Sequence, residues 1–229
     1  MPTLASKLTH ALRDELLRGD YRPGQPLRMN QLCERFQVSL SPLREALTRL
    51  ATEGFVELHA QRGFKVAPVS LDNHLEITRL RLQLEATALA ESIARGGDAW
   101  EIELLGAWHG LQLLDRRLAA GEAHDRDLWE VRHRALHMAL IGACRMPILL
   151  QFCETLLDFS DRYRRLFLRT PFINNDAPAE HAGIVEAALA RDAGRATELL
   201  ARHVQHTADN ITATLEGRQG AADPPAPDA

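Results

Sequence analysis

Four of the ten histidines are spaced so that together they could bind a metal ion. His133 and His137 are four residues apart, which places both imidazoles on one face of a predicted helix. His181 and His203 each lie on the apolar face of another predicted helix. Imidazole nitrogens are common zinc ligands, and facing helices of a bundle can bring such side chains together. The same spacing also permits four buried histidines with a purely structural role, so both interpretations stay open.

Residues 70–216 are predicted to form six helices that would position these histidines. Apolar residues at helical spacing, interrupted by glycine or proline, give helices over about residues 72–95, 98–120, 124–144, 147–168, 179–191 and 195–215. Asp98 and Glu101 have the spacing of a capping box that opens the second of them. The expected architecture is an antiparallel six-helix bundle. Residues 217–229, rich in Gly, Pro, Ala and Asp, are predicted to be a disordered tail.

Residues 30–54 have the pattern of two short helices joined by a tight turn. Apolar residues recur at helical spacing on both sides of a break at residues 37–39. Ser41 and Pro42 are predicted to open the second helix as its N-cap and first residue. A helix over about residues 4–18 precedes the pair, and two alternating runs, 55–58 and 64–67, follow as a hairpin. This order predicts a winged helix-turn-helix domain over residues 1–69, in a mainly α-helical protein.

Such a domain would present polar side chains to DNA from its second helix and its hairpin. The start of the second helix suits direct contact with base edges, and arginines further along suit phosphates. The hairpin turn could enter a minor groove. Each arginine could instead serve only solubility. The predicted residues are Ser39, Ser41 and Arg44 for bases, Arg35, Thr48 and Arg49 for phosphates, and Gln61, Arg62 and Gly63 for the minor groove.

Charge is divided unevenly between the two predicted domains. Residues 1–69 contain ten Lys and Arg against seven Asp and Glu, whereas the remainder contains 17 against 24. A slightly basic first domain on an acidic second one fits a nucleic-acid-binding module. The three cysteines form no CxxC pair, which favours reduced thiols. No signal pattern or membrane-spanning apolar run occurs, so we expect a cytoplasmic protein without membrane contact.

Two runs in the first domain carry a resemblance to a known family. They are LLRG…PG…L over residues 16–27 and L…FQVS…PLREAL…L…EGFV over residues 32–56. Together they resemble the DNA-binding domain of GntR-type transcription regulators. One departure is Leu40, where that family often has an arginine. The resemblance therefore does not transfer the operator sequence of better-known relatives.

Three further runs, residues 81–85, 132–140 and 180–192, resemble the ligand-binding (FCD-type) domain of the FadR-type branch of these regulators. Many members bind a divalent ion there with one Asp or Asn and three His. The resemblance places the three histidines on His137, His181 and His203, and the acid or amide on His133. It implies a divalent ion, zinc first, with nickel or manganese as alternatives. An all-histidine site would keep the full dipositive charge and attract an anionic effector more strongly.

The same resemblance suggests residues that would bind an effector. Arg81 lies near a buried stripe, where it could clamp an effector carboxylate or pair with a neighbouring acid. Tyr163, Arg164 and Arg165 could add donors, although an arginine-rich stretch is also typical of a solvated face. Residues 94–100 and the tryptophan and histidines of residues 129–137 are similar to glutarate-responsive repressors of this family. The resemblance therefore implies a small carboxylate effector, with glutarate or another dicarboxylate as the first candidate.

These observations predict a ligand-controlled transcription regulator, specifically a repressor that binds double-stranded operator DNA as a homodimer. One alternative is a metal-free regulator that senses an acyl chain, with structural histidines. Another is a metalloenzyme. The sequence contains no convincing general base beside a candidate ligand, such as an HExxH motif would supply, and no nucleophile motif, so we do not expect an enzyme.

Overall fold

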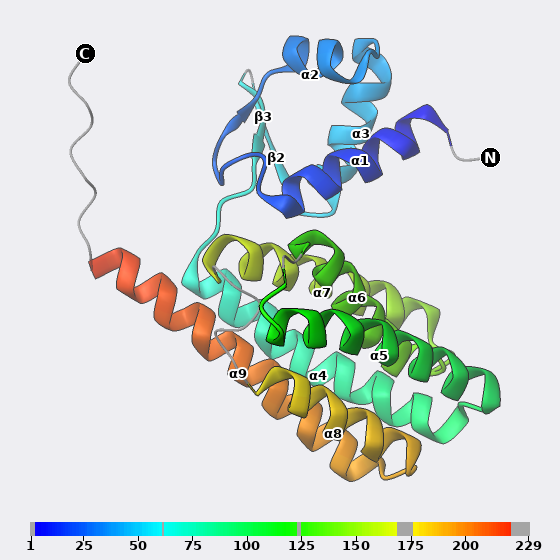
Figure 1. The fold of residues 1–229 in the computed structure, drawn as a ribbon. Coiled ribbons are helices and arrows are strands. Elements are labelled where there is room, and N and C mark those ends of the chain that lie inside the picture. Colours follow the sequence, from blue (N-terminus) through cyan, green and yellow to red (C-terminus); the bar gives the residue numbers. More distant parts are fainter. Residues whose placement is uncertain (1–2, 61, 123–124, 169–175, 221–229) are drawn as a thin grey trace. The chain divides into compact units, whose positions relative to one another are not determined.

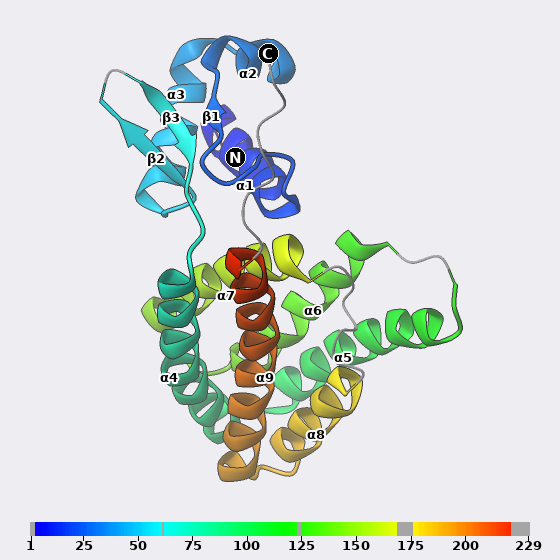
Figure 2. The same cartoon turned by 90° about the vertical axis from the view of Figure 1, so that its left-hand side faces the viewer.

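The computed structural model describes residues 3–60, 62–122, 125–168 and 176–220 (Figures 1 and 2). The chain divides into two compact units, residues 1–70 and 71–229. This boundary lies one residue from the one that the sequence predicts. Each unit has its own elements and is described separately below.

The first unit is a winged helix-turn-helix, as predicted. Its sheet has the order β1-β3-β2, with both pairs antiparallel. The strand β1 was not predicted, because two residues are too few to show an alternating pattern; it pairs Leu27 with Phe64. The elements are α1 (Leu4–Arg18), β1 (Pro26–Leu27), α2 (Met29–Phe36), α3 (Leu40–Thr52), β2 (Val56–His59) and β3 (Gly63–Val66).

The turn between α2 and α3 depends on Gln37, which has a left-handed backbone with φ of 52°. Its N–H donates to carbonyls of the last turn of α2. Ser39 is the N-cap of α3, so the predicted N-cap Ser41 is wrong by two residues. Pro42 is therefore the third helical residue. Its missing N–H causes no loss there, since the first N–H groups of a helix have no intrahelical acceptor.

One face of α3 is buried and forms part of the core of this unit. Leu43, Ala46, Leu47 and Leu50 are fully buried against α1 and the sheet. Burial of one helix face leaves the other exposed, which is the arrangement that a DNA-reading helix requires.

The second unit is the predicted six-helix bundle, and its fold class is confirmed. In both views α4 and α9 run side by side, and α8 packs against α9 (Figures 1 and 2). The apolar core includes Leu89, Leu104, Leu136 and Ile184, one from each of four helices. The helices are α4 (Leu71–Arg95), α5 (Asp98–Ala119), α6 (Arg126–Ile141), α7 (Pro147–Phe167), α8 (Ala177–Leu189) and α9 (Ala193–Gly220).

Two local predictions in this unit are wrong. The N-cap of α5 is Gly97, so Asp98 does not form a capping box with Glu101. Glu101 instead accepts a hydrogen bond from Arg191, whose guanidinium also lies over the ring of Trp100. The helix α9 reaches Gly220, so the first four residues of the predicted tail are helical. Residues 216–219 include Glu, Arg and Gln, which favour helix, and residues 221–229 lie outside the described part.

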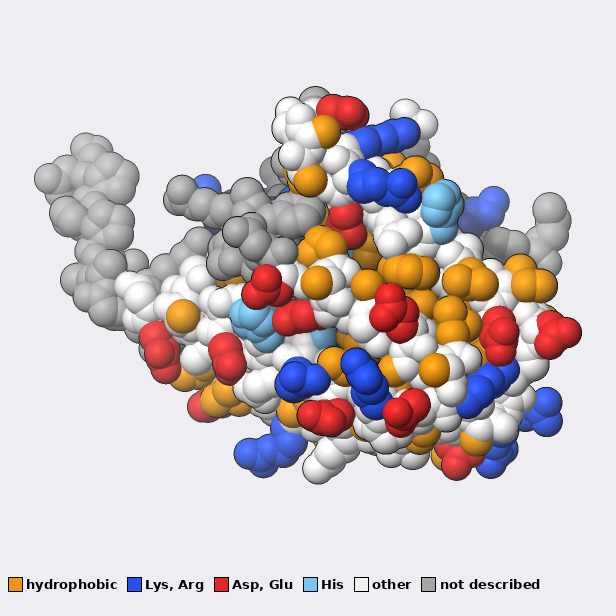
Figure 3. All heavy atoms as spheres, turned by 60° about the horizontal axis from the view of Figure 1, so that its bottom comes forward, with side chains coloured by type: hydrophobic (Ala, Val, Ile, Leu, Met, Phe, Trp, Pro, Cys, Tyr) orange, Lys and Arg blue, Asp and Glu red, His pale blue; other side chains and the backbone are white. Residues whose placement is uncertain are grey.

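The face of the helical unit that Figure 3 shows mixes charged side chains of both signs with hydrophobic ones. Among the described helices, none is both long and apolar enough to cross a membrane. The cysteines of the unit, Cys144 and Cys153, are buried free thiols.

The junction of α4 and α5 leads to a stability prediction. A Cβ at Gly96 would lie 2.4 Å from Cε3 of Trp100 and 2.7 Å from the carbonyl oxygen of Ser92. Because neither group can move freely, we expect Gly96→Ala to lower the free energy of unfolding by about 1–3 kcal/mol.

Urea unfolding followed by tryptophan fluorescence measures this change, since all three tryptophans are in the helical unit. The control is Gly106→Ala in α5, where an added Cβ meets nothing within 4 Å. Helix propensity should make that variant more stable by up to about 1 kcal/mol. Equal effects of the two substitutions would contradict the prediction.

Candidate functional site

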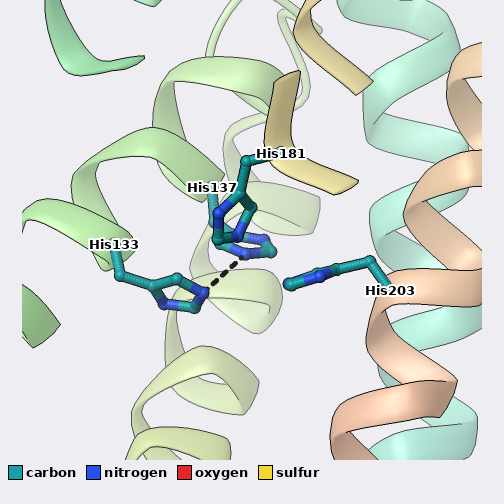
Figure 4. Close-up of side chains that lie close together, drawn as sticks. All are labelled: His133, His137, His181 and His203. Atoms are coloured by element: carbon teal, nitrogen blue, oxygen red, sulfur yellow. Dashed lines mark hydrogen bonds between the residues drawn. The ribbon is translucent and has the colours of Figure 1, made fainter. Parts of the chain in front are cut away.

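The four predicted histidines meet inside the helical unit (Figure 4). His133 and His137 extend from α6, His181 from α8 and His203 from α9, and their rings face one another. One nitrogen from each ring can be chosen so that all four lie within 4.8 Å of one another. The Nε2 atoms of His133 and His137 are 3.2 Å apart. Ligand nitrogens around tetrahedral zinc are separated by roughly 3.3 Å, so small shifts of the rings would complete such a site.

Unsatisfied hydrogen-bonding atoms also fit an ion in this cluster. All four side chains are at least 97% buried. Among the described residues, His133 Nδ1, His137 Nδ1 and both ring nitrogens of His181 have no hydrogen-bond partner. Buried polar atoms without a partner are rare and call for an explanation. Four imidazoles form a donor set that zinc, nickel and manganese can accept, so the cluster could hold a divalent ion.

Two carboxylates, those of Glu180 and Glu85, lie near the Nδ1 atoms of His203 and His137, respectively. Glu180 Oε2 is 2.8 Å from His203 Nδ1, and Glu180 Oε1 is 2.9 Å from His206 Nδ1. Glu85 Oε2 is 3.7 Å from His137 Nδ1, which is longer than a hydrogen bond. The hydrogen bond with His203 lowers the pKa of Glu180 to about 2. Burial favours protonation of Glu85, but the charge of Arg81 and contact with His137 outweigh it and lower its pKa to about 2.

The four histidines are held neutral by their surroundings. Burial lowers the pKa of His133 and His181 well below the usual value, and that of His137 to about 4. Burial also lowers the pKa of His203, against the opposing effect of Glu180. The Arg164 guanidinium and the neighbouring imidazoles lower the pKa of His133 further. Neutral imidazole is the form that coordinates metal ions.

The predicted effector residues are buried and already paired within the protein. Arg81 donates to Glu85 at 2.6 Å and to Ser160 Oγ at 2.8 Å, which is the ion pair that the sequence left as an alternative. Arg164 donates to Glu130 at 2.6 Å and to Asp161 at 3.1 Å.

Three further groups belong to this polar region. The Tyr163 hydroxyl donates to Asn73 at 3.0 Å, and Arg165 pairs with Asp161 and Asp127. Burial raises the pKa of Glu130 to about 7, against the opposing charge of Arg164. The alternative of a solvated arginine face does not hold for Arg164, which is buried with its charge compensated by two carboxylates.

The predicted DNA-contacting side chains follow the exposed face of α3. Ser39, Ser41, Arg44, Thr48 and Arg49 are all exposed, opposite the buried leucines of that helix. The apolar Leu40 shares this face and is 52% exposed.

The remaining predicted DNA contacts lie outside α3. Arg35 on α2 is exposed and pairs with Glu15 at 2.8 Å. In the hairpin, Arg62 is exposed, and Gly63 has φ of 77°, a backbone that favours glycine. Gln61 lies outside the described residues.

Four acids of the site were not predicted as functional residues. Glu85 is four residues after Arg81, so helix spacing could have identified their pairing. Glu180 directly precedes His181 but contacts His203 on another helix. Asp161 is three residues before Arg164 on α7, so helix spacing could also have identified that pair, whereas Glu130 meets Arg164 from α6. The sequence contains no signal for contacts between helices of this kind.

A pH dependence follows for the metal-free protein. The folded state keeps the four imidazoles neutral, whereas the unfolded chain protonates them below about pH 6.5. Below that pH the unfolded state binds more protons than the folded state, so the free energy of unfolding decreases as the pH is lowered. We expect the free energy of unfolding of chelator-treated protein to decrease from pH 6.5 to about 4. Tryptophan fluorescence in urea measures it.

Two variants test the assignment of this pH dependence. His181→Gln should flatten it, because one buried imidazole is removed. His10→Gln, at an exposed position of α1, should leave it unchanged. A wild-type protein equally stable at pH 7 and 5 would contradict the argument.

Comparisons with known proteins agree with both units. Residues 4–66 match the family model described as bacterial regulatory proteins, gntR family, and residues 76–206 match the FCD domain. The chain is 37% identical over 199 residues to the HTH-type transcriptional repressor GlaR of Escherichia coli (strain K12), covering 84% of this chain and 89% of that protein. It is also 37% identical over 194 residues to the uncharacterized HTH-type transcriptional regulator BphR of Paraburkholderia xenovorans (strain LB400), covering 85% and 79%.

A solved structure shows the shared fold. E. coli McbR/YncC superposes with a TM-score of 0.79 at 23% identity, over 92% of this chain and 98% of that one. The curated relatives are transcription regulators, so the prediction that this protein is not an enzyme is confirmed. The protein is a DNA-binding transcription regulator, and the chain belongs to the GntR family of bacterial regulatory proteins, with an FCD domain after its DNA-binding domain.

Proposed function

We propose that this regulator is a repressor whose helical domain holds one divalent ion and binds a small carboxylate. The observation that carries the proposal is the cluster of four buried imidazoles with unpartnered nitrogens. His133, His137, His181 and His203 would be the ligands. Zinc is the first candidate, with nickel or manganese as alternatives. The bound ion would supply positive charge for an anionic ligand.

The polar groups beside the cluster support a carboxylate as the ligand. Arg81 and Arg164 are close enough to the imidazoles to lower the pKa values of His203 and His133, respectively. Both arginines are paired in the free protein, so an incoming carboxylate would replace the contact with Glu85 or Glu130. Since the pKa of Glu130 is raised to about 7, that carboxyl releases its partner at lower cost near neutral pH. Tyr163 is a further candidate donor. A short dicarboxylate such as glutarate could engage two of these groups.

Control of DNA binding would come from two states of a homodimer. A two-fold protein matches a pseudo-palindromic operator, with one α3 in each major groove. A ligand shifts binding only if it has different affinities for the DNA-binding and non-binding arrangements. Sedimentation of the free protein and of its operator complex tests the dimer.

A metal-free sensor of an acyl chain is the second candidate. It requires four structural histidines, but a purely structural role leaves unexplained why, among the described residues, His133 Nδ1 and both nitrogens of His181 have no hydrogen-bond partner. Metal analysis of protein purified without chelator separates the two candidates, because an empty site in folded protein would favour the metal-free sensor.

One prediction of the proposed function concerns the ion and its ligand. Wild-type protein should contain close to one divalent ion per chain, and glutarate should raise its melting temperature only when metal is present. His137→Ala should lose the ion and the glutarate effect while still binding operator DNA. The control is His109→Ala, on α5 outside the cluster. An unchanged glutarate effect in His137→Ala would refute the site.

Another prediction of the proposed function concerns DNA binding by Arg44. Arg44 is exposed at the start of α3, where an arginine can pair with guanine N7 and O6. Arg44→Ala should weaken binding to the protein's own promoter region by about 10- to 100-fold. Arg202→Ala, on the exposed face of α9, is the charge-matched control. Equal affinity of the two variants in a gel-shift titration would exclude a base-reading role for Arg44.

A further inference from the structure

The four histidines of the cluster are not equivalent, because within the described part of the chain only two have a carboxylate near their Nδ1 atom. His203 Nδ1 is 2.8 Å from Glu180, and His137 Nδ1 is 3.7 Å from Glu85. Among the described residues, His133 Nδ1, His137 Nδ1 and both nitrogens of His181 have no hydrogen-bond partner, so the contact of His137 with Glu85 is one of charge and proximity. The supported rings lie on α9 and α6, and the supporting acids lie on α8 and α4.

A carboxylate on one imidazole nitrogen determines what the other nitrogen can do. It keeps the proton on Nδ1, which leaves the Nε2 lone pair available to a metal ion. It also fixes the orientation of the ring and increases the basicity of the ligand atom. Glu180 is well placed for this role, since its second oxygen is held by His206 at 2.9 Å. Glu85 is fixed by Arg81, which donates one hydrogen bond to each of its oxygens, and its Oε2 lies 3.7 Å from His137 Nδ1.

We infer that Glu180 and Glu85 are positioning residues of the metal site, and that they make His203 and His137 its two strong ligands. This inference rests on the proposed metal-binding function. It also replaces the expectation of a fully dipositive site. The negative charge that a carboxylate ligand would supply comes instead from carboxylates next to the ligand rings, and α4, which bears Glu85, becomes part of the site.

The decisive variant is Glu180→Gln, which keeps the side-chain shape and removes the charge. We expect the affinity of the full-length protein for zinc, measured by competition with a chromophoric chelator, to fall about 10- to 100-fold. The matched control is Glu186→Gln, an exposed acid on the same helix, which should bind zinc like the wild type. Glu180→Asp keeps the charge on a shorter side chain, so its affinity should lie between those of the wild type and Glu180→Gln.

A readout without metal distinguishes positioning from a general structural effect. In the apo protein, nitrogen NMR should show His203 with its proton on Nδ1, and Glu180→Gln should lose that preference. Glu85→Gln should also weaken zinc binding, by less than Glu180→Gln because its contact is longer. If Glu85→Gln fails to fold with Arg81 left unpaired, the Glu180 variants decide the question.

The outcomes separate this inference from the proposed function. If the wild type binds no divalent ion, both the proposed site and the inference are wrong. If the wild type and Glu180→Gln bind zinc equally, the site stands and the positioning role is overturned. Retention of the Nδ1 proton on His203 in Glu180→Gln would also overturn it.

Discussion

The centre of the helical domain keeps four imidazoles neutral near neutral pH by lowering their pKa values. Burial and mutual proximity keep His133, His137, His181 and His203 neutral. Neutral rings cannot repel one another as ions, so they can lie as close as 3.2 Å between nitrogens. The arrangement nevertheless leaves several buried nitrogens without partners, which is unfavourable in an apolar core. A bundle that needed only stability would fill this space with apolar side chains.

Buried ion pairs surround this neutral centre. Arg81 with Glu85, and Arg164 with Glu130 and Asp161, are each more than nine-tenths buried. Desolvation makes such pairs weak contributors to stability, while removal of one partner is strongly destabilising. Their presence beside the histidines therefore suits recognition better than folding. They keep charged groups available inside the domain without leaving any charge uncompensated.

Sequence patterns predicted the structural features that depend on residues close together along one helix. The helix-turn-helix, the six helices and the convergence of His133 with His137 follow from periods of three and four residues. Contacts between helices were predicted only where a resemblance to known regulators was available, as for His181 and His203. Glu180 and His203 are 23 residues apart, and Arg164 and Glu130 are 34 apart, so spacing contains no information about either pair.

Local signals failed where tertiary contacts competed with them. Arg191, between α8 and α9, donates a hydrogen bond to Glu101, so Glu101 is not available for the predicted capping box. Ser41 has the right type for an N-cap, but Ser39 also does, and Leu40 can enter the helix before it. The sequence left the pairing of Arg81 open. In the structure, Arg81 and Glu85 are both buried on α4 and form an ion pair.

The connection between the two domains is short. The strand β3 ends at Val66 and α4 begins at Leu71, so four residues join the wing to the helix that bears Arg81 and Glu85. Even when extended, four residues reach only about 14 Å, which leaves little slack. The helix that supplies Arg81 and Glu85 to the polar centre of the second unit is therefore also the first element after the wing in the chain.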